Sequence, residues 1–254
     1  MVEFFEHLLD NSSGLQIEYI RTHPLDINRV TEAKNRIKPE HASLPRDSLD
    51  FSFAKARLAV LTSSNNGIRK LIEQNEKYDS TISRYLRAIG YTRTNQPKKA
   101  IQILEPLQKE HKHPWIKLAL AEAYHANNQM GKAIELLETM NELYAGYLPV
   151  TIAYAKALNS TRQPEKSIEL LLRQLQTDET AIVYQTLAKS YYLNGQVSAA
   201  LEATGNQYFM QGYNELALQQ YQNALDQDDL SSTSKVRLEA KKKELLEAVK
   251  AQYR

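Results

Sequence analysis

Small residues recur along this chain at a nearly constant interval, and this interval restricts the possible fold more than any other feature. They stand early in successive apolar segments, with steps of 33, 34 and 33 residues, at Ala100, Ala133, Ser167 and Ala200. Another alanine lies twelve residues before each, at Ala88, Ala121, Ala155 and Ala188. Two helices can approach closely only where their side chains are short, so each pair predicts a helical hairpin. Hairpins that recur at this interval predict a stacked helical repeat array.

A third position strengthens the pattern, because a large residue lies nine before each second-helix small residue. These residues are Tyr91, Tyr124, Leu158 and Tyr191. A small residue followed by Tyr on one helix, with a small residue on the next, resembles the tetratricopeptide repeat (TPR). The resemblance implies an all-α TPR-type α-α superhelix, or solenoid, that binds other proteins. We expect TPR-like repeats over residues 50–233.

The repeat pattern changes near both ends of the array. Ile68, with Ala56 twelve residues earlier, gives a divergent first unit. Ala217 follows Ala200 by 17 residues, half a repeat, so either the segment 198–211 serves two units or one helix has been lost. Residues 234–254 lack the pattern and predict a C-terminal capping helix, because the ends of such arrays need a polar outer face. Its expected apolar stripe is Leu238, Leu245, Leu246 and Val249, and its expected solvated face is Lys241, Lys242 and Lys243.

Composition excludes several classes of function. The chain has no cysteine, so disulfides, thiolate nucleophiles and Cys-ligated zinc are excluded. A net charge of +2 favours no particular partner. Only the C-terminal lysine cluster resembles the basic face of a nucleic-acid binder, so we expect no nucleic acid. No apolar run approaches the ~18 residues of a membrane span.

The first fifty residues lack the repeat and carry a different signature. Phe4-Phe5 with Leu8-Leu9 precedes Tyr19-Ile20-Arg21-Thr22-His23-Pro24, and Asn28-Arg29-Val30 follows. This order resembles the end of the catalytic domain in periplasmic HExxH zinc metalloproteases that carry a C-terminal TPR array. We therefore interpret residues 1–38 as the C-terminal remnant of a metalloprotease domain and residues 39–49 as a linker.

The resemblance implies a zinc metalloendopeptidase as the parent protein, with zinc as its cofactor. None of the six histidines stands in an H-E-x-x-H motif, so we expect the catalytic helix upstream of Met1 and neither catalysis nor a cofactor in this chain. His23 is the candidate extra zinc ligand in the full-length protein; the alternatives are a surface-loop histidine or one whose ring caps the helix that follows. The family further implies a periplasmic location, with client outer-membrane β-barrel proteins and the barrel-assembly machinery as partners.

First helices of TPR units line a groove where partners bind, and the repeat register projects a set of side chains into it. The expected partner-binding residues are Tyr85, Thr92, Arg93, Trp115, Glu122, His125, Lys156, Asn159, Gln185, Lys189 and Tyr192. Second-helix residues such as Glu135 and Glu169 should face outward. The groove set lacks the Lys/Asn pattern of TPRs that grip chaperone tails, and it suits misassembled protein segments held for quality control. The alternative is a free-standing TPR adaptor without a protease.

Overall fold

The computed structural model describes residues 48–252, and the predicted protease remnant, His23 and most of the predicted linker lie outside this range. Within the described range the chain forms twelve α-helices and no strand. Their bounds are α3 (Leu49–Thr62), α4 (Asn65–Glu76), α5 (Thr81–Arg93), α6 (Pro97–Glu110), α7 (Pro114–Ala126), α8 (Met130–Leu143), α9 (Leu148–Ser160), α10 (Pro164–Gln174), α11 (Ala181–Leu193), α12 (Val197–Met210), α13 (Asn214–Leu225) and α14 (Ser232–Gln252).

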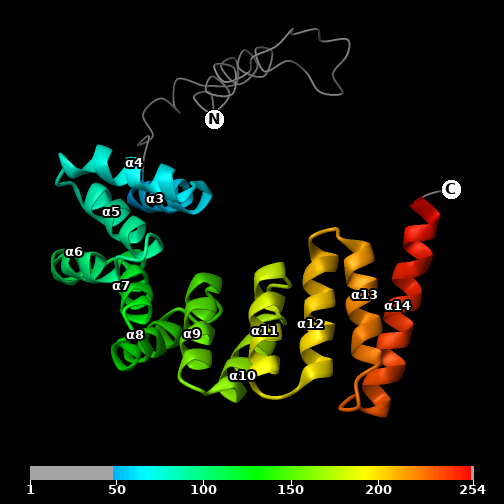
Figure 1. The fold of residues 1–254 in the computed structure, drawn as a ribbon. Coiled ribbons are helices and arrows are strands. Elements are labelled where there is room, and N and C mark those ends of the chain that lie inside the picture. The colour runs from blue at the N-terminus through cyan, green and yellow to red at the C-terminus, as the bar shows by residue number, and fades with distance from the viewer. Residues whose placement is uncertain (1–47, 253–254) are drawn as a thin grey trace, which may run out of the picture. The chain divides into compact units, whose positions relative to one another are not determined.

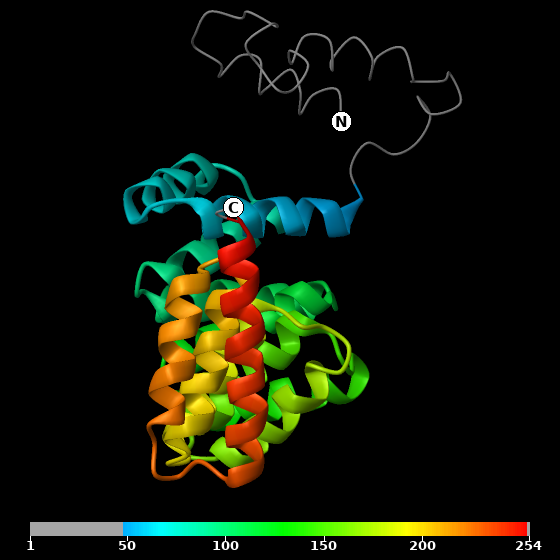
Figure 2. The same ribbon diagram turned by 90° about the vertical axis from the view of Figure 1, so that its right-hand side faces the viewer.

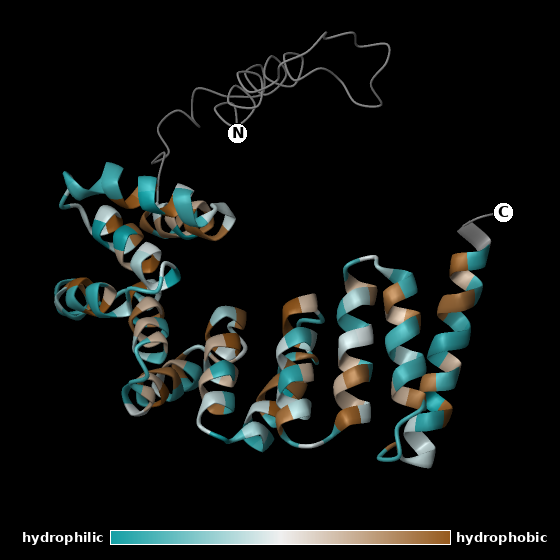
Figure 3. Cartoon of the chain, viewed as in Figure 1, coloured by the Kyte–Doolittle hydropathy of each residue, from teal (hydrophilic) through white to brown (hydrophobic). Residues whose placement is uncertain are grey.

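From α4 onward each helix packs against the next one along the chain (Figure 1). Alternate helices also touch, since α5 contacts α7, α7 contacts α9, and α9 contacts α11. These are the predicted first helices of successive units, which therefore adjoin one another. Each helix carries both hydrophobic and hydrophilic residues along its surface, as a helix between a core and solvent must (Figure 3). The prediction of an all-α, TPR-type superhelix is confirmed.

The periodic small residues lie in the interior, at the contacts between helices. Ala88, Ala121 and Ala155 on the first helices are fully buried. In the unit formed by α9 and α10, the Ser167 hydroxyl donates a hydrogen bond of 3.2 Å to the backbone carbonyl of Ala155. A side chain can reach the neighbouring backbone in this way only where two helices approach closely. The repeat interval therefore reflects a steric requirement for small residues.

A left-handed residue follows the first helix in four successive units, after α5, α7, α9 and α11. Positive φ angles of 58°, 57°, 59° and 76° occur at Asn95, Asn128, Arg162 and Gly195. The next residue is glutamine each time, and its backbone N–H donates to the carbonyl five residues earlier, as Gln96 does to Tyr91 at 2.8 Å. This is the Schellman arrangement, which satisfies a carbonyl that the helix end would leave unpaired. It turns the chain into the second helix at the same place in these four units.

The half-repeat near the C-terminus is explained by the double use of α12. Gly212, 17 residues after Gly195, has a φ of 80°, and the Tyr213 N–H donates to the Tyr208 carbonyl at 2.9 Å. The end of α12 therefore has the turn of a first helix, and α12 packs extensively on both α11 and α13. Of the two sequence-based alternatives, one helix serving two units is correct. A Cβ on Gly205 would lie 2.4 Å from the Tyr221 ring, so this contact requires glycine.

The last helix, α14, packs along α13 (Figure 2). Leu238 and Leu245 of the predicted stripe are buried, whereas Leu246 is exposed and does not belong to it. The expectation of a solvated lysine face holds for Lys243, which is exposed, whereas the Lys241 side chain is 40% exposed and its ammonium also donates to the Asn206 side chain at 2.8 Å. The same ammonium lies 3.8 Å from Glu202. Lys241 therefore links α14 to α12.

Candidate protein-binding groove

Three adjoining hollows run across α7, α9, α11 and α12, and together we call them the groove. The first, of about 380 Å³, lies between α7 and α9; the second, about 430 Å³, between α9 and α11; the third, about 360 Å³, between α11 and α12. His125 and Lys156 line both the first and the second, and Gln185 and Lys189 line both the second and the third. The hollows therefore form one continuous surface over successive first helices.

The structure brings most of the expected partner-binding residues together on this surface. Those that line the groove are Glu122, His125, Lys156, Asn159, Gln185, Lys189 and Tyr192. The first and last of these are 70 residues apart in the sequence. Glu135 and Glu169, expected to face outward, lie on α8 and α10 away from the three hollows. The repeat register thus places the side chains correctly on this part of the array, while their binding role stays a prediction.

The expectation that Tyr85 contacts a partner needs correction, because its side chain is fully buried. Phe53 of α3 covers it, with the two rings edge to face and their centroids 4.8 Å apart. Phe53 also stacks on His113 at a centroid distance of 4.3 Å. Burial raises the pKa of Tyr85 to about 12, although the charge of nearby Arg57 opposes the rise. Tyr85 is therefore a core residue beneath α3.

Three further expected residues do not line the groove. Trp115 is half-buried, with the Tyr147 ring at 6.0 Å and the Arg57 guanidinium 5.5 Å from its centroid. The Thr92 hydroxyl donates to the Ala88 carbonyl at 3.2 Å, which directs it to its own helix. Arg93 is exposed at the end of α5. Thr92 and Trp115 are thus engaged in internal contacts, whereas Arg93 is exposed outside the three hollows.

An ion pair from α3 bounds the groove at that end. The Arg57 guanidinium donates two hydrogen bonds to the Glu122 carboxylate, at 3.0 and 2.6 Å. Their side chains are 18% and 31% exposed, so water screens the pair only in part. Burial disfavours the charge on Arg57, but the charge of Glu122 and these hydrogen bonds outweigh it and raise the pKa of the guanidinium. Sequence reasoning missed Phe53 and Arg57, because the repeat register contains no signal for this contact.

The open part of the groove is basic and has apolar walls. Lys156 and Lys189 are both exposed, and the Lys189 ammonium lies 5.6 Å from the centroid of the Tyr192 ring. The His125 ring nitrogen lies 2.8 Å from the Ser160 hydroxyl. Burial, and then the charge of Lys156, lower the pKa of His125. Apolar side chains that sequence reasoning did not assign to the groove include Leu148, Ile152, Ile182 and Leu193.

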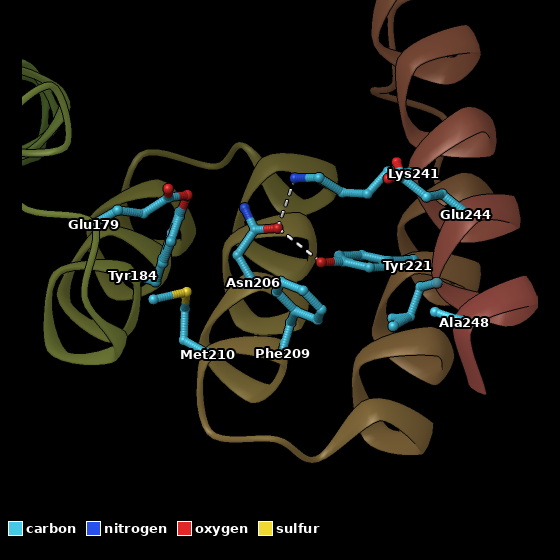
Figure 4. A pocket seen from close by; sticks show the side chains of 10 residues that line it. Glu179, Tyr184, Asn206, Phe209, Met210, Tyr221, Lys241, Glu244 and Ala248 are labelled. Carbon is cyan, nitrogen blue, oxygen red and sulfur yellow. Dashed lines mark hydrogen bonds between the residues drawn. The ribbon is translucent and has the colours of Figure 1, made fainter. Parts of the chain in front are cut away.

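A separate hollow of about 280 Å³ lies among α11 to α14 (Figure 4). The Asn206 side-chain oxygen accepts hydrogen bonds from the Tyr221 hydroxyl and from Lys241, both at 2.8 Å. Phe209 and Met210 reach the same hollow and are half-exposed. Burial, and then the charge of Glu202, raise the pKa of Tyr221 to about 12. This polar cluster joins the last helices to one another.

Residues 48–252 contain no group of three or more His, Cys, Asp or Glu side chains arranged to hold a metal ion. Over the same residues, no helix has the length and hydropathy needed to cross a membrane. The groove presents aromatic, amide and ammonium groups, which are the kinds of group that contact a polypeptide.

The fold and the groove define a TPR-type protein–protein interaction module. The family model described as tetratricopeptide repeat matches residues 91–145. Among solved structures, a thermophilic TPR protein of Thermus thermophilus superposes with a TM-score of 0.51. That match has 15% identity and covers 78% of this chain and 99% of the other, so it shows the fold alone.

Among curated proteins, this chain is similar to the β-barrel assembly-enhancing protease of Escherichia coli K12. The two are 25% identical over 250 residues, which cover 95% of this chain and 51% of the protease. The protein of the same name from Shigella flexneri matches to the same extent. The chain therefore spans about half the length of the curated relatives it matches.

Proposed function

We propose that this chain is the partner-recruiting module of a periplasmic zinc metalloendopeptidase that acts on misassembled outer-membrane β-barrel proteins. The observation that carries the proposal is the continuous groove, in which side chains of α7, α9, α11 and α12 converge. Exposed aromatic and polar side chains on adjoining rigid helices suit the capture of polypeptide, because they give contact area with little loss of entropy. The identity of the client follows from the similarity to the β-barrel assembly-enhancing protease.

In this proposal the work of the parent protein is divided. The zinc site belongs to the catalytic domain, with His23 as a candidate extra ligand there, and the repeats select what reaches it. The barrel-assembly machinery is the second proposed partner, by the same similarity. The rival proposal is a TPR adaptor with no protease attached; it predicts a reading frame without an H-E-x-x-H helix before residue 1.

Site-specific photo-crosslinking tests where the client binds. A photoreactive residue replaces Gln185 in the groove or Glu165 on the outer surface, and the purified chain is mixed with a urea-unfolded outer-membrane β-barrel protein. Both positions are exposed, so neither replacement should disturb the core. We expect crosslinks from Gln185 and few from Glu165. Equal yields from both positions, or a preference for Glu165, would contradict groove binding.

A further inference from the structure

We infer that the groove selects extended segments bearing acidic side chains, which pair with Lys156 and Lys189. The inference rests on the proposed function and specifies the kind of segment that the groove accepts. The two lysines occupy equivalent positions on α9 and α11, 33 residues apart, and line the same hollow. An extended segment that crosses these helices would meet both ammonium groups.

The charges in the groove are unbalanced. No carboxylate of the described residues forms an ion pair with Lys156 or Lys189. Glu122 is the single acidic side chain among the described residues that line the three hollows, and Arg57 already engages it. The remaining charge of the groove is therefore positive. Two ammonium groups without a carboxylate partner in a concave surface concentrate the potential there and attract carboxylates.

The outer helix α8 has the opposite charge. It carries one basic and three acidic side chains, Lys132, Glu135, Glu138 and Glu142. An acidic segment would therefore be repelled from α8 and attracted to the groove, whereas the outer helix α10, with two acidic and two basic side chains, is neutral. Complementarity of this kind selects partners and orients them before contact more than it adds affinity.

Amide side chains in the same hollow indicate an extended backbone. A helix satisfies its own backbone groups, whereas an extended segment presents free N–H and C=O groups. Gln185 is exposed in the hollow and can pair with them. The Asn159 amide lies at the same wall and donates to the Ser190 hydroxyl at 2.9 Å.

Peptide binding with matched charge variants tests the inference. The probes are short fluorescent peptides with blocked ends, in which valine alternates with glutamate, glutamine or lysine. Blocked ends remove the terminal carboxylate as an alternative source of charge. We expect the glutamate peptide to bind tightest, and the Lys156→Gln/Lys189→Gln chain to lose about tenfold in affinity for it. The control, Lys98→Gln/Lys166→Gln, has the same net charge and changes exposed lysines of α6 and α10.

The outcomes separate this inference from the proposed function. If the glutamine peptide binds as tightly as the glutamate peptide, or if both double variants lose affinity equally, the acidic preference is wrong. An unfolded barrel protein could then still crosslink at Gln185, which would leave the proposed function intact. If the glutamate peptide binds through the two lysines but the unfolded barrel protein does not crosslink, the client is wrong and the acidic preference stands.

Discussion

Arg57 on α3 and Glu122 on α7 form a two-point ion pair across 65 residues of sequence, and this pair sets one boundary of the groove. Phe53, one turn earlier on α3, covers Tyr85 and stacks on His113. The side chains of α3 thus occupy the positions where the repeat pattern alone would place a partner. The open groove begins beyond this pair, at His125 and Lys156.

We expect the Arg57–Glu122 pair to stabilise the array measurably. A double-mutant cycle with Arg57→Ala and Glu122→Ala should give a coupling free energy of about 1–3 kcal/mol, because the pair is bidentate and partly buried. The control is the exposed pair Arg173–Glu169, at 2.8 Å, which should give roughly 0.3–0.5 kcal/mol. Urea denaturation measures both cycles. Equal coupling free energies in the two pairs would contradict the claim that the α3 contact stabilises the array more than an ordinary surface ion pair does.

Ala121 tests the close approach of α7 to its neighbours. It is fully buried in a cluster with Leu137 and Met140 of α8. Ala121→Leu should lower the free energy of unfolding by about 1–3 kcal/mol, since a larger side chain at a fully buried helix contact forces its neighbours out of their preferred packing. Lys132→Leu, at an exposed position of α8, is the control and should change it by less than about 0.5 kcal/mol. Thermal denaturation followed by circular dichroism compares the two variants. A leucine at position 121 that melts like the parent would contradict the repeat register.

Gly205 tests the double use of α12. A Cβ at this position would lie 2.4 and 2.6 Å from two atoms of the Tyr221 ring, which is buried and cannot move freely. Gly205→Ala should therefore destabilise the α12–α13 contact, by about 1–3 kcal/mol, despite the better helix propensity of alanine. Gly131→Ala on α8 is the control, because nothing lies within 4 Å of its added Cβ. Hydrogen exchange should accelerate in α13 and α14 for the first variant only. Unchanged exchange there would mean that α13 does not depend on this contact.

His125 should make stability depend on pH. Burial and the charge of Lys156 lower its pKa in the folded chain below the ordinary value of 6.5. The unfolded chain then binds the proton more readily, so the contribution of neutral His125 is present above this value and is lost as the pH falls below it. His125→Gln should flatten the pH dependence of the unfolding free energy between about pH 7 and pH 5. Parallel profiles for parent and variant would contradict this assignment.

The sequence could predict the repeats because their determinants are local. Small residues at fixed intervals mark hairpin contacts, and turn residues such as Asn95 and Gly195 recur at the same step. The groove positions beyond His125 follow from the same register. Arg57 has its partner 65 residues away, so no periodicity could predict the burial of Tyr85 or the boundary of the groove. The contact of Lys241 with Asn206 could not be predicted, because Asn206 lies 35 residues earlier and the repeat pattern carries no signal for it.

The most direct test of the central claim, that the groove holds the client segment, is a binding measurement with one bulky residue placed inside or outside it. Gln185→Trp would fill the hollow between α9 and α11, and Glu165→Trp adds the same side chain on the exposed surface of α10. Affinity for a purified, unfolded β-barrel protein is measured by fluorescence anisotropy. We predict at least about tenfold weaker binding for Gln185→Trp and parental binding for Glu165→Trp. If Gln185→Trp bound as tightly as the unsubstituted chain and Glu165→Trp bound more weakly, the site would lie on the outer surface, and the claim that the groove holds the client would be wrong.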